Sequence, residues 1–147
     1  MAKMTVAEWT AKTKADLDDV VIATCIDIST RVINYTPVGN PSLWKTQYPP
    51  KGYTGGQAKG NWIANIGSPA SASTRPPDKD GSEAIAAMTS EAQKAPGSVF
   101  YLTNNLPYIR RLEYEGWSSQ APSGMIRRVI AESPAIVRDV IQVVKQK

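Results

Sequence analysis

The sequence contains no histidine at all and only one cysteine, Cys25. These absences exclude every reaction that uses an imidazole base, and every zinc site built from His and Cys ligands. A hydrolase made from this chain would have to use carboxylates and lysines instead. Cys25 lies among apolar residues at helical spacing, which favours a small buried side chain over a reactive thiol. We therefore expect no catalytic residues, no cofactor and no bound metal.

Long hydrophobic runs are also missing. The N-terminal stretch MAKMTVAEWTAKTK has no apolar centre of the kind found in a signal peptide, and no run approaches the length of a membrane span. The formal charge of +4 is modest, and Lys and Arg are interspersed with Asp and Glu rather than gathered in a basic arm. A length of 147 residues fits one domain with one core. We expect a single domain over residues 1–147, intracellular and without a membrane partner.

The first element that the sequence predicts is a long helix. Thr5 and Glu8 have the spacing of a capping box, so the helix should begin there. It should end near Asn34, because Pro37 disfavours helical backbone at Thr36. Apolar residues recur at helical spacing, which predicts one buried face made of Val6, Trp9, Leu17, Val21, Cys25, Ile28 and Val32.

A long irregular segment follows, at about residues 36–60. Four prolines and five glycines exclude regular structure over most of it, yet Trp44, Tyr48 and Tyr53 make it unusually aromatic. Such a loop is either a solvated excursion whose aromatic side chains pack locally, or an arm that docks on a neighbouring subunit. Two motif look-alikes in it, an S-x-x-K at Ser42 and a glycine run ending at Gly60, lack the partner residues that acyl transfer or phosphate binding requires.

Two strands and a short helix are predicted next. The stretch NWIANIG places Trp62, Ala64 and Ile66 on one face and Asn61, Ile63 and Asn65 on the other, and this alternation predicts a strand. A short helix should begin at Ser82, and β-branched and aromatic residues predict a second strand over Ser98–Thr103.

The last element should be a helix with one apolar side. Its apolar residues are Ile126, Val129, Ile130, Val137, Val140, Ile141 and Val144. Pro134 should kink this helix or restart it with Ser133 as the cap. Together these elements predict an α+β fold, with the long N-terminal helix and the C-terminal helix packed on a small, mostly antiparallel sheet.

The stretch NNLPYIRRLEYEGWSSQAPSGMIRR, from Asn104 to Arg128, gathers charged residues, two prolines, two glycines, two tyrosines and a tryptophan. It should begin with a cap at Asn104 or Asn105 and a short helix over Tyr108–Glu115. Arg110 with Glu113, and Arg111 with Glu115, have the spacing of helical ion pairs, which weakens both a catalytic and a phosphate-binding interpretation. The simplest interpretation is a solvated helix that neutralises its own charges.

These residues carry a resemblance. The segments TPVG, GGQAKGNW and YLTNNLPYIRRLEYEGWSSQAPSGMIRR, in that order, resemble the neck or tail-completion proteins of long-tailed bacteriophages, the family of the HK-type head-to-tail joining protein and the lambda-like tail-completion protein. The family's first block matches Thr36, Pro37, Val38, Gly60, Asn61 and Trp62. Its second block matches Thr103, Asn104, Pro107, Tyr108, Leu112, Glu113, Gly116, Ser118, Gln120, Ala121, Pro122, Gly124, Met125 and Arg127. Gly39 with a long insertion, and the extra Glu115, depart from the family pattern.

The resemblance implies an α+β fold, a place in the virion at the head-tail joint after synthesis in the host cytoplasm, and no enzyme activity. The implied partners are further copies of the chain in a hexameric ring, adjacent neck, tail-terminator or tail-tube proteins, and packaged DNA that passes through the ring. Aromatic and Arg residues are enriched where protein interfaces are strongest. The candidate assembly interface is therefore Trp44, Tyr48, Tyr53, Tyr108, Arg110, Arg111, Glu113, Trp117, Gln120 and Arg127.

A small nucleic-acid-binding module is the alternative. It would place Lys and Arg side chains on phosphates and stack Trp44 or Trp117 on bases. The basic residues available to it are Lys45, Lys51, Lys59, Arg110, Arg111, Arg127 and Arg128.

Overall fold

The computed structural model describes residues 3–43, 51–71 and 74–147. Its main elements are two long helices, α1 (Val6–Tyr35) and α5 (Ile126–Lys145), and a short helix α3 (Ser82–Ala92). A two-stranded sheet is made of β1 (Ile63–Ile66) and β2 (Phe100–Thr103). The shorter pieces are a 3₁₀ turn at Pro41–Leu43, α2 (Gln57–Gly60) and α4 (Ile109–Tyr114). The predicted α+β class is confirmed.

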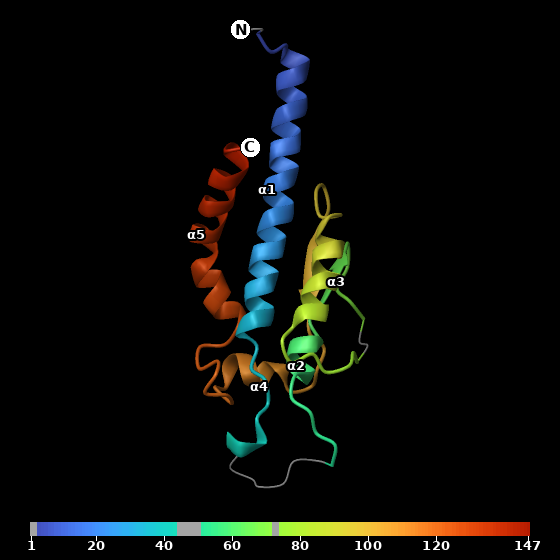
Figure 1. Cartoon of the computed structure of the whole chain (residues 1–147), viewed down its shortest axis with the longest axis vertical. Helices are drawn as coiled ribbons and strands as arrows, with labels where there is room; N and C mark the ends of the chain where they lie inside the picture. Colours follow the sequence, from blue (N-terminus) through green and yellow to red (C-terminus); the bar gives the residue numbers. More distant parts are fainter. Residues whose placement is uncertain (1–2, 44–50, 72–73) are drawn as a thin grey trace.

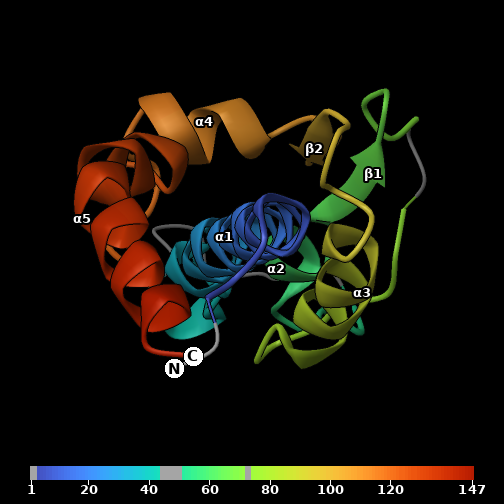
Figure 2. The same cartoon turned by 90° about the horizontal axis from the view of Figure 1, so that it is seen from above.

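Helix α1 runs through the middle of the molecule (Figure 1). Seen along its axis, α5 lies on one side of it and α3 with the two strands on the other (Figure 2). The strands are antiparallel, with Ile63 opposite Thr103 and Ile66 opposite Phe100. Two strands alone are marginally stable in water, so the sheet depends on the helices packed beside it.

The boundaries of α1 follow from its end residues, as the sequence predicts. The Thr5 hydroxyl accepts a hydrogen bond from the Glu8 backbone N–H at 3.2 Å, and the Glu8 carboxylate accepts from the Thr5 N–H at 2.7 Å. Backbone and side-chain bonds from Thr5 hold the pKa of Glu8 below its usual value. At the other end the helix stops one residue before Thr36, which has extended backbone ahead of Pro37.

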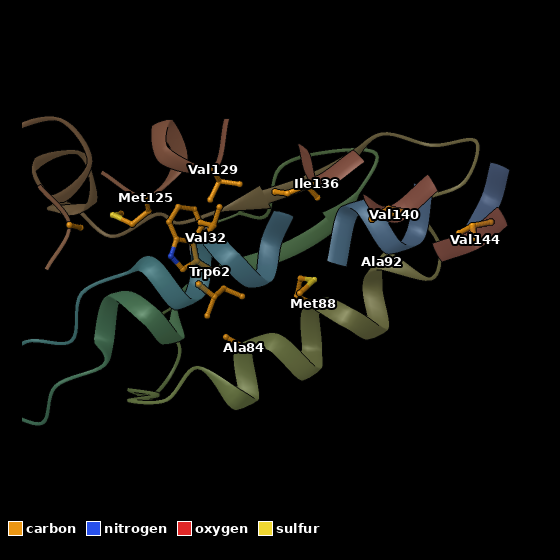
Figure 3. Packing of buried hydrophobic residues seen from close by; sticks show 12 residues of the cluster. Val32, Trp62, Ala84, Met88, Ala92, Met125, Val129, Ile136, Val140 and Val144 are labelled. Carbon is orange, nitrogen blue, oxygen red and sulfur yellow. The ribbon is translucent and has the colours of Figure 1, made fainter. Parts of the chain in front are cut away.

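The core lies where α1, α3, α5 and the 121–125 segment meet (Figure 3). Its buried apolar residues are Val32, Ile33, Trp62, Ala84, Met88, Ala92, Ala121, Met125, Val129, Ile136, Val140 and Val144. Of the face predicted for α1, only Val32 is buried. Val6, Trp9, Leu17 and Val21 are exposed, so the expectation that Val21 lies in the core is wrong. A helical stripe indicates which side of a helix is apolar, but not how far along the helix its neighbours reach.

The predicted apolar side of α5 is divided in the same way. Val129, Val140 and Val144 are buried together with Ile136, whereas Ile130 is 63% exposed and Ile126 is 39% exposed. Ile136 was not among the residues predicted for this side, and of those that were, Ile126 and Ile130 lie outside the core.

Pro134 does not restart α5, which is one helix from Ile126 to Lys145. A proline has no N–H to donate to the carbonyl four residues earlier, here that of Ile130. The Ser133 hydroxyl donates to this Ile130 carbonyl at 2.7 Å. Ser133 therefore satisfies the acceptor that Pro134 leaves without a backbone donor, and it is not a helix cap.

Replacing Ser133 with Ala should lower the free energy of unfolding by about 1 kcal/mol, the usual net value of one intramolecular hydrogen bond. Ser133→Ala in a background with Pro134→Ala should cost much less, because position 134 then has a backbone N–H that can reach the Ile130 carbonyl. Urea denaturation of the four proteins measures this coupling. Equal costs in both backgrounds would contradict the compensating role of Ser133.

Candidate assembly interface

The two parts of the first family-like block meet in space. The Trp62 indole N–H donates to the Thr36 hydroxyl at 2.8 Å, and that hydroxyl donates to the Val32 carbonyl at 2.7 Å. Trp62 is 3% exposed and Thr36 is 2% exposed, so the chain of hydrogen bonds is buried. The C-terminal end of α1 is thus tied to the residue just before β1.

Asn61 makes a second buried tie. Its amide nitrogen donates to the carbonyls of Gln57 and Arg75, and its amide oxygen accepts from the Arg75 N–H at 2.8 Å. The prediction that Asn61 belongs to the first strand is wrong: the strand begins two residues later, and the Asn61 side chain holds the backbone of Arg75.

Asp78, within a segment that the sequence presents only as turn and linker, caps helix α3. Its carboxylate accepts from the backbone N–H groups of Gly81 at 3.1 Å and Ala84 at 3.0 Å. Gly56 and Gly60 pack so closely on residues 76–79 that an added Cβ would come within 2.7 Å of backbone atoms there. Asp78 was not predicted as a cap, because it lies four residues before Ser82, where the helix was expected to begin.

The second family-like block supplies further ties to the first. Gln120 brackets the backbone of Val38: its amide oxygen accepts from the Val38 N–H at 3.2 Å, and its amide nitrogen donates to the Val38 carbonyl at 2.9 Å. Asn104 donates to the Ala58 carbonyl at 2.9 Å and accepts from the Leu106 N–H. Neither Asn104 nor Asn105 caps α4, which has no side-chain cap.

Glu113 is the most deeply placed charge of this region, at 4% exposure. Its carboxylate accepts from the backbone N–H groups of Met125 at 2.7 Å, Ile126 at 3.0 Å and Arg127 at 3.0 Å. The first N–H groups of a helix have no backbone acceptor within the helix, and the N-cap residue of α5, Met125, offers no side-chain acceptor. Glu113 therefore caps α5 from another helix.

Burial by itself raises the pKa of Glu113, but hydrogen bonds from Arg127, Met125 and Ile126 outweigh it and leave the pKa lowered. The Arg127 side chain adds an ion pair at 3.3 Å and a contact of its Nη2 with the Glu113 carbonyl. Gly124 has φ of 76°, and a Cβ there would lie 2.5 Å from the Glu113 carboxylate. Only glycine fits this approach.

The geometry corrects the expected role of Glu113. It is not a free interface charge, and it does not pair with Arg110. The Arg110 guanidinium lies 6.0 Å from the Tyr114 ring centroid, and that of Arg111 lies 4.5 Å from the Trp117 ring centroid. Among the ion pairs of the described residues, neither Arg110–Glu113 nor Arg111–Glu115 occurs. The hydrogen bonds of Glu113 with the start of α5 are stronger than an ion pair within α4, which would contribute about a few tenths of a kcal/mol.

The arginines, Tyr114 and Trp117 form what we call the α4 face, made of Arg110, Arg111, Tyr114, Trp117 and Arg127. Tyr114 is 62% exposed and Trp117 is 56% exposed. The Arg127 guanidinium lies 5.2 Å from the Tyr114 ring centroid. Tyr114 was not among the predicted interface residues, although its place between Arg111 and Trp117 in the sequence was a usable signal.

A cavity of about 810 Å³ opens beside the α4 face. Tyr53, Tyr108, Trp117 and Gln120 all line it, together with residues of the 37–40 segment and α2. The structure therefore brings together these four predicted interface residues. Trp44 and Tyr48, and with them the tip of the proposed arm, lie outside the described residues.

A polar network fixes α5 against the C-terminal half of α1. Glu132 accepts from Arg31 at 3.1 Å, from the Tyr35 hydroxyl at 2.9 Å and from Arg128 at 3.3 Å. The Arg128 guanidinium also lies 3.7 Å from the Tyr35 ring centroid. Hydrogen bonds from Tyr35, then Arg31 and Arg128, lower the pKa of Glu132. The network sets the antiparallel register of the two helices.

Comparison of the chain with protein-family models, with curated protein sequences and with solved structures gives no match. Across residues 3–43, 51–71 and 74–147, no helix has the length and apolar character needed to cross a membrane. In the same ranges, no three Cys, Asp or Glu side chains gather into a group that could hold a metal ion.

Proposed function

We propose that this chain is a structural protein of the bacteriophage neck, which assembles as a ring between the head connector and the tail tube and has no catalytic role. The observation that carries the proposal is the exposed apolar stripe of α1, where Val6 is 82% exposed, Trp9 61% and Leu17 60%. Large apolar side chains grouped on one surface favour a protein partner over solvent. The virion would be the site of action.

The family-like blocks support the same proposal from another side. Their polar residues Thr36, Asn61, Glu113 and Gln120 are occupied in internal hydrogen bonds. These bonds hold the loops around the cavity in one shape, which limits the entropy lost when the loops dock. The α4 face and the cavity beside it are then a preformed contact surface for the neighbouring neck, tail-terminator or tail-tube protein.

The α4 face also gives a specific reason to keep the nucleic-acid-binding alternative, because Arg110 and Arg111 are exposed and Arg111 lies over the exposed ring of Trp117. Other basic residues fit it less well. Lys59 is half-buried with its Nζ 3.4 Å from the Asn34 carbonyl, and burial lowers its pKa. Arg127 and Arg128 are engaged with Glu113 and Glu132, and Lys45 and Trp44 lie outside the described residues. A steep loss of oligonucleotide affinity with salt would favour this alternative.

The test is complementation of a phage in which this gene has been disrupted. Without the protein, DNA-filled heads and complete tails should accumulate unjoined, and the parent protein should join them. Trp117→Ala should fail to join them while changing the free energy of unfolding by less than about 1 kcal/mol, since it loses only an exposed ring and its cation–π contact. Electron microscopy of lysates and thermal melts measure the two quantities.

The matched control is Val99→Ala, because Val99 is 59% exposed, directly precedes β2 and is not part of the α4 face. It should both fold and join heads to tails. If disruption leaves joined, infectious particles, the neck role is wrong. If Trp117→Ala joins particles normally, the α4 face is not the contact.

A further inference from the structure

The N-terminal half of α1 extends beyond the elements that cover its C-terminal half. At 1.5 Å per residue, the 30-residue α1 is about 45 Å long and the 20-residue α5 about 30 Å. The contacts of Glu132 with Arg31 and Tyr35 set α5 against the C-terminal part of α1. The N-terminal turns of α1 therefore project past the end of α5 and past α3 (Figure 1).

We call residues 6–21 the α1 overhang. Val6, Trp9, Leu17 and Val21 are its exposed apolar residues, spaced three, eight and four positions apart. With Thr13 between them they form one stripe at the three-four spacing of helix-helix contacts. Salt bridges flank the stripe on both sides, Lys12–Asp16 at 2.6 Å and Lys14–Asp18 at 2.8 Å. The overhang thus has the pattern of a helix that packs against another helix.

A second apolar stripe lies on α5, beside the part that faces the core. We call Ile126, Ile130, Val137 and Ile141 the α5 stripe; their spacings are four, seven and four. Ile130 is 63% exposed and Ile126 39%, while Val137 and Ile141 are half-buried. Leaving such side chains in water forgoes about 25 cal/mol for each Å² that a partner would cover.

The charges beside the two stripes are complementary. At 3.6 residues per turn, the outer edge of the α5 stripe carries Arg127, Arg138 and Lys145, all exposed. Arg138 and Lys145 make no ion pair within the described residues. One flank of the overhang carries Asp16 and Asp19 together with Lys12, which is paired with Asp16 at 2.6 Å, so among the residues that the structure describes Asp19 is the unpaired acid of this flank. Over residues 6–21 the acids are Glu8, Asp16, Asp18 and Asp19 against Lys12 and Lys14, a net negative helix end.

We propose that the α1 overhang of one copy packs against the α5 stripe of the next copy. This inference rests on the proposed ring and names the two faces that build it. Two overhangs facing each other would leave both α5 stripes uncovered, and two α5 stripes would bring their arginines together. The contact is therefore heterologous, and it closes into a ring when the rotation between neighbours is a fixed fraction of a turn.

The test uses two variants that each block one face, Leu17→Asp and Ile130→Asp. Both positions are about 60% exposed, so each variant should fold and melt like the parent. In sedimentation the parent should self-associate. Each variant alone should associate more than about 100-fold more weakly, because the aspartate would be buried unpaired in the contact.

The decisive sample is an equimolar mixture of the two variants. The Leu17→Asp chain keeps its α5 stripe and the Ile130→Asp chain keeps its overhang, so the mixture should form a one-to-one dimer and nothing larger. Val99→Asp, at an equally exposed position off both stripes, should self-associate like the parent.

Three results would overturn the proposal: a parent that stays monomeric at every concentration, an Ile130→Asp variant that still self-associates, or a variant mixture that forms no dimer. A monomeric parent that nevertheless complements the disrupted gene would remove this contact and leave the neck role standing. A parent that self-associates through these two faces without restoring joined particles would remove the neck role and leave this contact standing.

Discussion

Replacing Glu113 with Ala should lower the free energy of unfolding by about 3 kcal/mol and shift the melting temperature down by many degrees. The substitution removes the acceptor for three backbone N–H groups at the start of α5 and leaves them without a partner, that of Met125 in a buried position and those of Ile126 and Arg127 in partly buried ones. Loss of a helix cap costs about 0.5–2 kcal/mol, and loss of charge-assisted hydrogen bonds adds about 1.5–3 kcal/mol. Calorimetry or urea denaturation measures the change.

The pH dependence gives an independent check. The folded-state pKa of Glu113 is lowered, so its carboxylate contributes stability above the unfolded pKa of about 4.3, and this contribution is lost as the pH falls through the folded pKa. The difference in stability between the parent and Glu113→Gln should therefore be full at neutral pH and shrink in this acidic window. Taking the difference cancels the other carboxylates with lowered pKa values, such as Glu8 and Glu132.

Gly124→Ala is the companion variant, because its Cβ would meet the Glu113 carboxylate and because φ of 76° strains any residue with a side chain. It should destabilise the protein as well, and less than additively with Glu113→Ala. If Glu113→Ala instead melts like the parent, the carboxylate does not cap α5, and Glu113 becomes available again as an interface charge.

Replacing Trp62 with Ala should have the second large effect, a loss of about 3–5 kcal/mol, which is usual for truncating a buried aromatic side chain. Trp62 fills the space between Val32, Met125 and Val129 (Figure 3). Its indole N–H is also the donor that ties the start of the sheet to Thr36 at the end of α1. The variant should lose the cooperative melting transition near the parent's midpoint.

The hydrogen bond can be separated from the packing. Thr36→Val removes the acceptor and leaves the indole N–H buried without a partner, which should cost about 1–3 kcal/mol. Trp62→Phe should cost less in a Thr36→Val background than alone, since the donor is then already unpaired. Strict additivity in this double-mutant cycle would contradict the bond.

Local features of the sequence were sufficient for the long helices and the two strands, but not for α2 or the 3₁₀ turn at Pro41–Leu43. Thr5 with Glu8 and Pro37 gave both ends of α1, and the β-branched and aromatic run gave the strand that ends at Thr103. These predictions succeeded because capping, proline sterics and strand alternation act within a few residues of the chain.

Local sequence patterns could not predict contacts between residues that lie far apart in the sequence. Glu113 has the spacing for a pair with Arg110, but three backbone donors twelve to fourteen positions away compete more strongly for it. Val21 has the helical spacing of the core residues of α1. It lies toward the N-terminal part of the helix, however, and it is 39% exposed. Of the candidate interface, the grouping of Tyr53, Tyr108, Trp117 and Gln120 around one cavity depends on how two distant loops meet, which spacing alone cannot supply.

The central claim, that this chain forms a ring at the head-tail joint, is tested most directly by an electron-microscopy map of the phage particle. The account predicts a ring of density at the joint into which the fold fits, with the α1 overhang of each copy against the α5 stripe of its neighbour and Trp117 at the boundary with an adjacent neck or tail protein. Infectious, fully joined particles in which this chain is absent from the joint would contradict it.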